Sequence, residues 1–529
     1  MKWQRIPPFF AAWCLHAATL TVASSNLQVT FTNADVTGIT NVLTGEQYLR
    51  SPSSNSQTDL VLLQSTGQQL APAGPWTVNA AGTSASLTMA DSGRAITIAV
   101  SIDAATQQVV VNLDGKASHG GVQFLEWGST GFDMNIGRFI LPGQGGVALT
   151  TASFSASSYN GFYGTYWEAP LSLFQTARGG VAFYSTDTNS LFKDILMSAN
   201  TQQTANQQIQ TEAVAPWAQA TEAGPIEWRI AAYTGEWQNG ARIYRDWHNA
   251  KFPPAPVTGA RAWVNNIRTV VQASDNPYDN STLDALANVL NPSQTLLYLV
   301  QWRSQRYDTD YPDYNWIPSA PNYIAHAHQL GFHVLLHANA MGVSSTNADY
   351  ASVSQYQMRD PSTGQLVGWL WSDPPSTPNR FAGINPAASA YRQLLISRLT
   401  PAIQNLQADA IHLDAGACVN DANGLIQGMN CWQGLEQLQK DLLSAFPSLV
   451  IGGENTNDSI APYQDLSQPL IWAANQSPDL TPPFRLAHTC STITIDTHIS
   501  ARSTRIALDS SPRSHHTRAR PCFRRSARP

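Results

Sequence analysis

Charged residues are scarce in this sequence. Only 12% of its 529 residues are Asp, Glu, Lys or Arg, about half the usual share. The formal net charge is -6, whereas a nucleic-acid-binding domain is generally basic, so no nucleic-acid partner is expected. With 43% hydrophobic residues the chain still has ample material for folded cores, and its length favours two or three domains.

Cysteine and several catalytic motifs are also scarce or missing. Five cysteines are too few for a disulfide scaffold. Cys418 and Cys431 flank one loop and could pair in an oxidising compartment, or they could remain two separate thiols. The sequence has no GxSxG elbow and no phosphate-binding glycine loop, which disfavours a serine hydrolase or a nucleotide enzyme. No cofactor is expected.

Long apolar runs are limited to the N-terminus. Lys2 and Arg5 precede an apolar run from 9 to 22, and small residues follow at 23–25. This pattern predicts a secretory signal peptide over residues 1–25, because the run is shorter than a membrane span; an uncleaved anchor is the alternative. No later stretch reaches spanning length, so we expect a secreted, extracellular protein without stable membrane insertion.

Residues 26–235 have the pattern of an antiparallel β-sandwich. Short alternating or β-branched runs, such as residues 95–100, are separated by Gly, Asn, Asp and Ser, as in strands joined by turns. Residues 236–251 then show apolar side chains at helical spacing, and prolines within 252–256 end that run. The sequence therefore predicts a sandwich domain followed by a helical linker over 236–256.

From residue 257 onward, predicted strands and helices alternate. The expected strands cover residues 262–264, 294–302, 332–339, 408–414 and 449–454, with a weaker one at 469–473, and the expected helices cover 319–330, 388–405 and 432–445. Repeated βα units with almost continuously apolar strands indicate a parallel sheet or barrel. We therefore expect a (β/α)8-type (TIM) barrel over 257–486, incomplete at its C-terminal end if no further strands follow.

The last residues, 487–529, break this pattern. From His488 onward there are eight arginines but no Lys, Trp or Tyr. A functional basic tail is one interpretation; an end that is not native coding sequence is the preferred one. This Arg/Ser-rich tail is expected to be disordered.

Two acids end successive predicted strands. Asp414 ends the strand at 408–414 and Glu454 ends the next one. Side chains alternate along a strand, so Asp414 shares a face with His412. Catalytic groups of α/β barrels lie at the carboxyl ends of strands, and glycosidic-bond hydrolysis needs two carboxylates. We predict Asp414 as nucleophile and Glu454 as general acid/base; a loop-capping Asp and an ordinary surface Glu are the alternatives, and Asp421 and Asp458 are rival acids.

Sugar-binding residue types cluster after the strand at 294–302. Aromatic faces stack on sugar rings, and Asp and Arg bind hydroxyl pairs through charge-assisted hydrogen bonds. The predicted substrate-binding residues are Trp302, Arg303, Tyr307, Asp308, His337, Trp371, His412, Asn455 and Trp472. A buried aromatic loop that closes the barrel is the alternative.

Histidines raise the question of a metal. His333 and His337 share a face of one predicted strand, and His412 faces inward on the next. No HExxH motif occurs, and isolated barrel histidines are usually core hydrogen-bonding groups or substrate contacts. The aspartates within 308–313 imitate a calcium loop but lack its remaining spacing. No metal site is expected.

The order of these parts resembles endo-α-N-acetylgalactosaminidase-like glycoside hydrolases and related retaining α-glycosidases with an N-terminal mutarotase-like β-sandwich. The resemblance spans residues 26–472. It is carried by the sandwich stretch 161–184, the linker 237–247, Ile411-His412-Leu413-Asp414 and Gly452-Gly453-Glu454-Asn455.

The resemblance implies a secreted hydrolase that cleaves an α-glycosidic bond of an oligosaccharide or glycoconjugate with retention. Asp414 would match the nucleophile and Glu454 the acid/base. The family's barrel continues where this chain turns to arginine and serine, so a carbohydrate-binding or catalytically inactive protein with a truncated barrel is the alternative.

Overall fold

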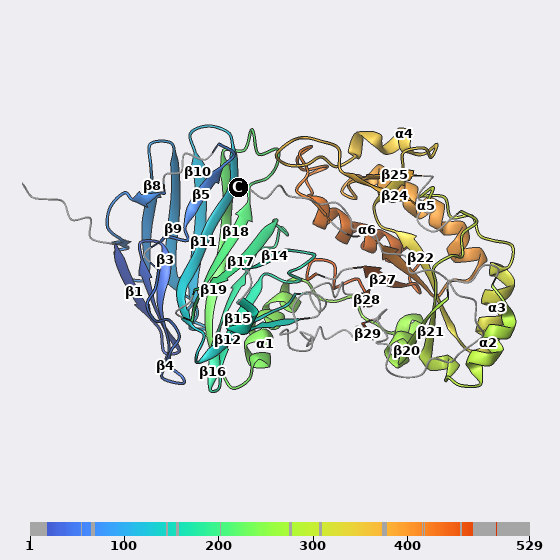
Figure 1. The fold of residues 1–529 in the computed structure, drawn as a ribbon, viewed down its shortest axis with the longest axis horizontal. Helices are drawn as coiled ribbons and strands as arrows, with labels where there is room; N and C mark the ends of the chain where they lie inside the picture. The colour runs from blue at the N-terminus through green and yellow to red at the C-terminus, as the bar shows by residue number, and fades with distance from the viewer. Residues whose placement is uncertain are drawn as a thin grey trace, which may run out of the picture.

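Figure 1 shows a β-sandwich beside an α/β body, in a computed structural model. The structure describes residues 18–468 apart from 54, 65–68, 144–145, 155–157, 201–202, 274–277, 306–308, 373–377, 415, 417 and 455–456, and it also describes 493–494. Over these residues, none of the helices has the length and apolar character needed to cross a membrane.

The sandwich consists of two large sheets, as the sequence predicts. The first has the order β1 (Thr19–Ala23), β2 (Leu27–Thr32), β3 (Asp35–Asn41), β11 (Val122–Asp133), β18 (Thr204–Glu212), β17 (Lys193–Ala199) and β14 (Tyr159–Phe162), with β4 (Glu46–Gln47) on β3 and β5 (Asp59–Leu62) on β11. The second has the order β13 (Val147–Leu149), β12 (Gly137–Leu141), β15 (Leu171–Thr176), β16 (Gly179–Ser185), β19 (Glu222–Thr234), β10 (Val109–Ala117), β9 (Arg94–Ile102), β8 (Ser84–Ala90) and β6 (Ala71–Pro72), with β7 (Thr77–Val78) on β8. One short 3-10 turn, η1 (Ala152–Phe154), lies between β13 and β14 in the sequence.

Alternation explains why these strands pack face to face. Along β9, Ile96, Ile98 and Val100 are buried while the residues between them are more exposed, so one face of the strand enters the core. Phe132 and Phe174 stand at the centre of that core, with ring centroids 4.8 Å apart.

The first strand lies within the predicted signal peptide. β1 pairs antiparallel with β2, with Thr19 opposite Thr32 and Ala23 opposite Gln28. It lies at the edge of its sheet, next to β2 alone in the strand order, so cleavage after residue 25 would remove an edge strand without interrupting the sheet.

The predicted linker helix is confirmed as α1 (Trp237–Lys251). Its buried residues Ala241 and Tyr244 join a cluster with Leu171 and Tyr184 of the second sheet. The linker is therefore packed onto the sandwich rather than suspended between the domains.

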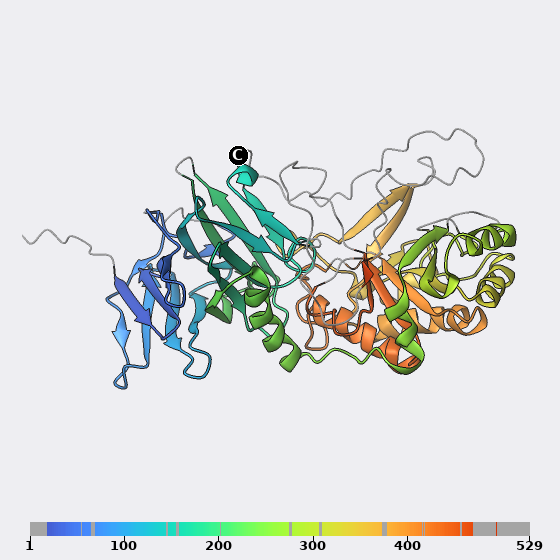
Figure 2. The ribbon, with the colours of Figure 1, turned by 90° about the horizontal axis from the view of Figure 1, so that it is seen from below.

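The α/β body is built on one parallel sheet. Its order is β20 (Thr269–Ala273), β21 (Thr295–Leu299), β22 (His333–Asn339), β26 (Ala410–Asp414), β27 (Val450–Glu454), β28 (Leu466–Gln468) and β29 (Ile493–Thr494). Its helical segments are η2 (Gly259–Asn266), α2 (Asn280–Ala287), η3 (Pro292–Gln294), α3 (Ala320–Leu330), α4 (Tyr350–Val353), η4 (Ser354–Tyr356), α5 (Ser389–Asn405) and α6 (Cys431–Ala445). A small antiparallel sheet, β23 (Gly342–Ser344), β25 (Pro378–Gly383) and β24 (Gly368–Ser372), follows β22. Figure 2 shows the helices of this body packed around its parallel sheet.

The two faces of the parallel sheet pack differently. Leu336, Ile411 and Ile451 belong to the large core that includes Leu399 of α5 and Leu438 of α6. Residues of the opposite face, Leu296, Tyr298, Leu335, Ala410, Val450 and Leu466, form their own cluster. The second face therefore corresponds to the interior of a barrel-like sheet, and side chains further along the same strands continue it.

Of the sequence expectations for this body, the barrel is met only in part, one strand is wrong, and two segments lie largely outside the described residues. Seven parallel strands are present in the described part of the sheet, and an eightfold closed barrel is not shown. Residues 262–264 belong to the 3-10 segment η2 instead of a strand, because Trp263 stacks on His333 at 4.0 Å between ring centroids and Val264 enters the interior cluster. Residues 469–473 lie outside the described residues, as does the predicted tail except for Ile493–Thr494, which pair with β28.

Candidate active site

Asp414 and Glu454 end neighbouring parallel strands at the same level. The register of β26 and β27 places Leu413 opposite Gly453, and each acid is the next residue and the last of its strand. Ala410 and Val450, four residues earlier in each strand, belong to the interior cluster. Because side chains alternate, both acids lie on the interior face at its carboxyl edge, where barrel enzymes carry their catalytic groups.

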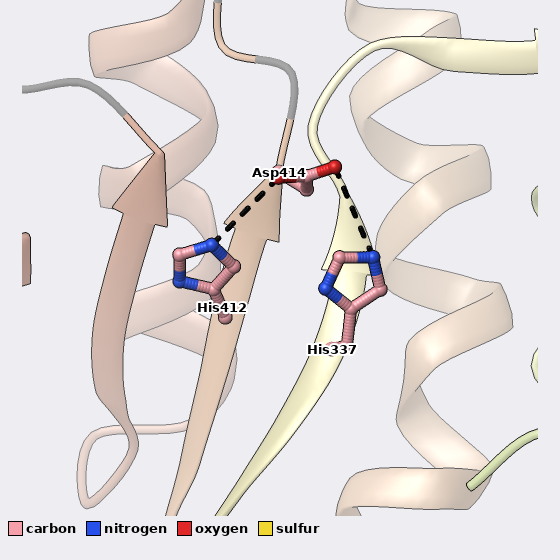
Figure 3. A group of neighbouring side chains, drawn as sticks. All are labelled: His337, His412 and Asp414. Carbon is pink, nitrogen blue, oxygen red and sulfur yellow. Dashed lines mark ion pairs between the residues drawn. The ribbon is translucent and has the colours of Figure 1, made fainter. Parts of the chain in front are cut away.

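Asp414 lies between two buried histidines. Figure 3 shows its carboxylate above the imidazoles of His337 and His412, which come from β22 and β26. His337 Nε2 is 3.9 Å from Asp414 Oδ2, and His412 Nε2 is 3.9 Å from Asp414 Oδ1. The Asp414 side chain is 16% exposed, compared with 1% for His337 and 0% for His412. Of these three side chains, the carboxylate is therefore the most exposed to solvent.

The two histidines differ in their partners. The Tyr298 hydroxyl lies 2.7 Å from His337 Nδ1, which fixes the ring. Among the described residues, neither ring nitrogen of His412 has a hydrogen-bond partner. Burial, with a smaller effect of His337, lowers the pKa of His412 well below its ordinary value, so this imidazole is neutral. Tyr298 was not among the predicted site residues, although alternation from Leu296 would have placed it on the interior face.

Gln464 packs closely against one of the two glycines that precede Glu454. A Cβ atom on Gly453 would come within 2.7 Å of Gln464 Oε1, and one on Gly452 would lie 3.5 Å from His412 Nδ1. The loop after β26 passes close by, because a Cβ on Gly416 would be 3.4 Å from the Glu454 carbonyl oxygen. The backbone around the two acids is therefore compact, and larger residues at 453 would displace Gln464.

A disulfide restrains the loop that follows Asp414. Cys418 and Cys431 are bonded, with a Cα–Cα distance of 5.5 Å, which resolves the alternative that the sequence left open. Cys431 is the first residue of α6, and Asn430 caps that helix by accepting from the Gln433 N–H. Asn430 also donates to the Asn189 carbonyl of the sandwich. The loop is thus attached both to α6 and to the N-terminal domain.

Two predicted sugar-binding residues have packing roles instead. Trp302 is fully buried, its indole N–H donates to the His337 carbonyl at 2.8 Å, and Tyr314 stacks on it. Arg303 is 3% exposed, lies over the Tyr311 ring at 3.8 Å, and donates to the carbonyls of Thr309 and Asp313. Their rings and charges are used within the protein, so these two predictions need correction: both residues support the wall next to β22.

The side chains of the remaining predicted substrate-binding residues are not described. Tyr307, Asp308, Asn455 and Trp472 lie outside the described residues, and Trp371 belongs to β24, of which only the backbone is described at that position.

The rival acids have structural partners. Asp421 accepts from the Arg359 N–H and from Asn385 Nδ2, while Asp458 accepts from the hydroxyls of Tyr163 and Tyr244. Asp414 and Glu454 differ from them in position, since each is the last residue of a strand of the parallel sheet.

Comparison with solved structures identifies the architecture. The fold resembles an α-N-acetylgalactosaminidase. The ligand-free enzyme NagBb from Bifidobacterium bifidum superposes with a TM-score of 0.67 at 13% sequence identity, over 88% of this chain and 83% of that one. Its complex with GalNAc gives 0.66 at 12% identity, over 90% and 84%, and its Gal-NHAc-DNJ complex gives 0.66 at 13% identity, over 89% and 83%. At these identities the likeness concerns the fold.

Comparisons by sequence are less informative about function than the comparison of folds. Residues 224–429 match a family described as a domain of unknown function, DUF6259. This segment includes the linker helix and Asp414 but ends before Glu454. No curated protein matches this chain.

Proposed function

We propose that this protein is a secreted glycoside hydrolase that cleaves an α-glycosidic bond with retention of configuration. The observation that carries the proposal is the register of β26 and β27, which sets Asp414 and Glu454 side by side at one end of the sheet. Retaining enzymes use two carboxyl groups about 5 to 5.5 Å apart, whereas inverting enzymes place them about 6.5 to 9.5 Å apart. Adjacent strands lie about 4.8 Å apart, which suits the shorter spacing.

Each carboxyl group has a distinct task in this reaction. Asp414 attacks the anomeric carbon and forms a glycosyl ester, while Glu454 gives its proton to the departing glycosidic oxygen. The Glu454 carboxylate then takes a proton from water, and that water attacks the same carbon and releases Asp414. The sugar leaves with its original configuration because the carbon has been inverted twice.

The fold supports an α-linked substrate. The solved structures with this architecture include an α-N-acetylgalactosaminidase in complex with GalNAc. We therefore propose an α-N-acetylgalactosaminide or a related α-galactoside, carried by an oligosaccharide or a glycoconjugate, as the substrate class. His337 and His412 form the floor beneath Asp414 and would lie under the ring that it attacks.

Export is supported by the disulfide. The bond between Cys418 and Cys431 is of a kind that persists in oxidising compartments and is rare in the cytosol. N-terminal sequencing of the protein from the medium would test the signal peptide predicted over residues 1–25.

Hydrolysis of a panel of aryl α- and β-glycosides tests the proposal. We expect turnover of an α-glycoside, with the α-anomer as the first product in a proton NMR time course. Asp414→Asn should abolish turnover, whereas Asp284→Asn, at a 59% exposed surface position paired with His326, should retain it. First release of the β-anomer would exclude retention, and full activity in Asp414→Asn would exclude this nucleophile.

A non-catalytic carbohydrate-binding protein is the second candidate. The observation in its favour is the shortness of β28 and β29, with three and two residues, at one end of the described sheet. Binding of the same glycosides without turnover by the wild-type protein would favour this candidate.

A further inference from the structure

Three potential ligands converge at the floor of the site. One nitrogen each of His337 and His412 and one carboxylate oxygen of Asp414 all lie within 4.8 Å of one another. They come from adjacent parallel strands, with His337 paired to His412 in the register. Figure 3 shows both imidazoles below the Asp414 carboxylate, each facing one of its two oxygens. Two imidazoles and one carboxylate are a donor set typical of borderline divalent cations such as Zn²⁺, with an open coordination position.

His412 provides an independent indication of a ligand. Its side chain is fully buried, and within the described part of the chain both ring nitrogens lack a hydrogen-bond partner. Buried polar groups are normally satisfied, since an unpaired one costs free energy. Nε2 is the nitrogen that faces Asp414, so a cation between them would satisfy the buried group.

The surroundings of His337 are also suited to a ligand. Its Nδ1 lies 2.7 Å from the Tyr298 hydroxyl, and its Nε2 faces Asp414. Metal-bound histidines are commonly oriented by a hydrogen bond at their other ring nitrogen. Tyr298 can play this part, because its hydroxyl can accept from Nδ1–H and leave the Nε2 lone pair for a cation.

We propose that His337, His412 and Asp414 bind one divalent transition-metal ion of the Zn²⁺ class. Zinc bonds of about 2.0–2.1 Å place tetrahedral ligand atoms about 3.3 Å apart. With one oxygen taken from Asp414, the three ligand atoms lie within 4.8 Å of one another. Each pair therefore needs to approach by at most about 1.5 Å, which side-chain rotation can supply.

A second histidine–aspartate group in the described residues provides the contrast. At the opposite, amino end of the sheet, Asp409 accepts from the Val334 N–H at 2.8 Å and contacts His328 Nε2 at 2.9 Å. These groups already satisfy one another, so His328 offers a matched control for the proposed site.

The metal would act on the proposed hydrolysis as an inhibitor. While the Asp414 carboxylate is coordinated, its lone pair is not available to attack the anomeric carbon. This consequence rests on the proposed function, but metal binding itself does not. Zinc would therefore inhibit turnover with the same midpoint as its binding.

Calorimetric titration of the metal-stripped full chain with Zn²⁺ tests the site. We expect one ion per chain, and an affinity lowered about tenfold or more in His412→Gln, His337→Gln and Asp414→Asn. His328→Gln should bind as the wild type does. Circular dichroism shows which variants are folded, and three independent variants keep the test decisive if one is not.

Two results would overturn the inference: no stoichiometric binding of Zn²⁺, or unchanged affinity in the folded site variants. The outcomes also separate the two proposals. A protein that hydrolyses α-glycosides but binds no zinc refutes the metal site alone, whereas one that binds zinc through these residues but hydrolyses nothing refutes the proposed function alone.

Discussion

Glu454 and Asp414 act in different steps of the proposed reaction, so their contributions can be separated by the choice of leaving group. Glu454→Gln removes the proton donor but leaves the nucleophile in place. General acid catalysis contributes about 10²- to 10⁴-fold, and we expect a loss of this size in kcat/KM for a substrate with a poor leaving group. An activated aryl α-glycoside should lose much less in that step, because its leaving group needs no proton.

Glu436→Gln is the control for this variant, since Glu436 pairs with Lys440 along α6. Equal losses on the activated and the unactivated substrate would contradict the acid role of Glu454.

The partners of Trp302 and Arg303 could not be predicted from their residue types alone. Their types suit sugar binding, and the surrounding aromatic residues strengthened that interpretation. In the structure Trp302 donates to the His337 carbonyl and Arg303 donates to its own loop. Residue type indicates which interactions are possible, but tertiary packing decides which partner is used. The inward direction of His412 and Asp414 was predictable because alternation is a local property.

At the scale of elements, the disulfide restrains the segment that follows the proposed nucleophile. Cys418 and Cys431 are 13 residues apart, and a loop of about 15 residues corresponds to about 3 kcal/mol of stabilisation in the chain-entropy account. We expect Cys418→Ser with Cys431→Ser to lower the denaturation midpoint and to raise KM, because the loop next to Asp414 becomes less restrained.

Reductant provides the control for this prediction. It should shift the wild type toward the behaviour of the double variant and leave the variant itself unchanged. A wild-type midpoint that does not respond to complete reduction would contradict the stabilising role of the bond.

The elements with strong local signals were predicted closely. The helices α1, α3, α5 and α6 and the strands β22, β26 and β27 lie within a few residues of their expected positions. Apolar periodicity and end signals explain this: α3 ends at Gly331, which has a φ of 95°, a conformation that glycine adopts without strain.

Elements with weak local signals were missed. Residues 262–264 are apolar, but three residues do not distinguish a strand from a 3-10 turn. The strands β23, β24 and β25 were not predicted, because they are short and depend on one another for pairing. Strand register and the approach of His337 to Asp414 are long-range properties, so the site could be predicted only as a set of inward-facing acids and histidines.

At the scale of the whole molecule, one buried carboxylate connects the two domains. Asp458, which follows β27, accepts from Tyr163 of the sandwich and Tyr244 of α1, and its carbonyl contacts His248 Nε2 at 2.9 Å. Burial and the charge of Asp458 raise the pKa of each tyrosine hydroxyl well above the ordinary value for tyrosine. Both hydroxyls therefore remain protonated and act as donors.

Removing either hydroxyl should loosen this junction. Hydrogen bonds to charged groups contribute about 1.5–3 kcal/mol, and we expect Tyr163→Phe and Tyr244→Phe each to destabilise the protein by about this amount in denaturant unfolding. Tyr166→Phe, at a 39% exposed position of the sandwich, should be nearly neutral. A midpoint for Tyr244→Phe that equals that of Tyr166→Phe would exclude a stabilising role for the contact.

The sandwich should also be more stable in mild acid than at neutral pH. Glu126 of β11 accepts from Gln208 and Gln210. Burial, opposed by the Gln210 hydrogen bond and reinforced by Asp59, raises the pKa of Glu126 from 4.5 to about 7. Between these two values the folded state binds more protons than the unfolded state, so stability falls as the pH rises through this window. Allowing for the partial exposure of Glu126, the effect is about 2 kcal/mol.

Glu126→Gln should therefore raise the thermal midpoint at pH 7.5 and flatten its dependence on pH between about 4.5 and 7. A residual slope should remain, since burial also raises the pKa of Asp35 to about 6. Glu222→Gln, at an exposed position of β19, should keep the wild-type slope. If Glu126→Gln kept it as well, the charge on Glu126 would not be the cause, and the remaining dependence would have to arise from Asp35 or from groups outside the sandwich.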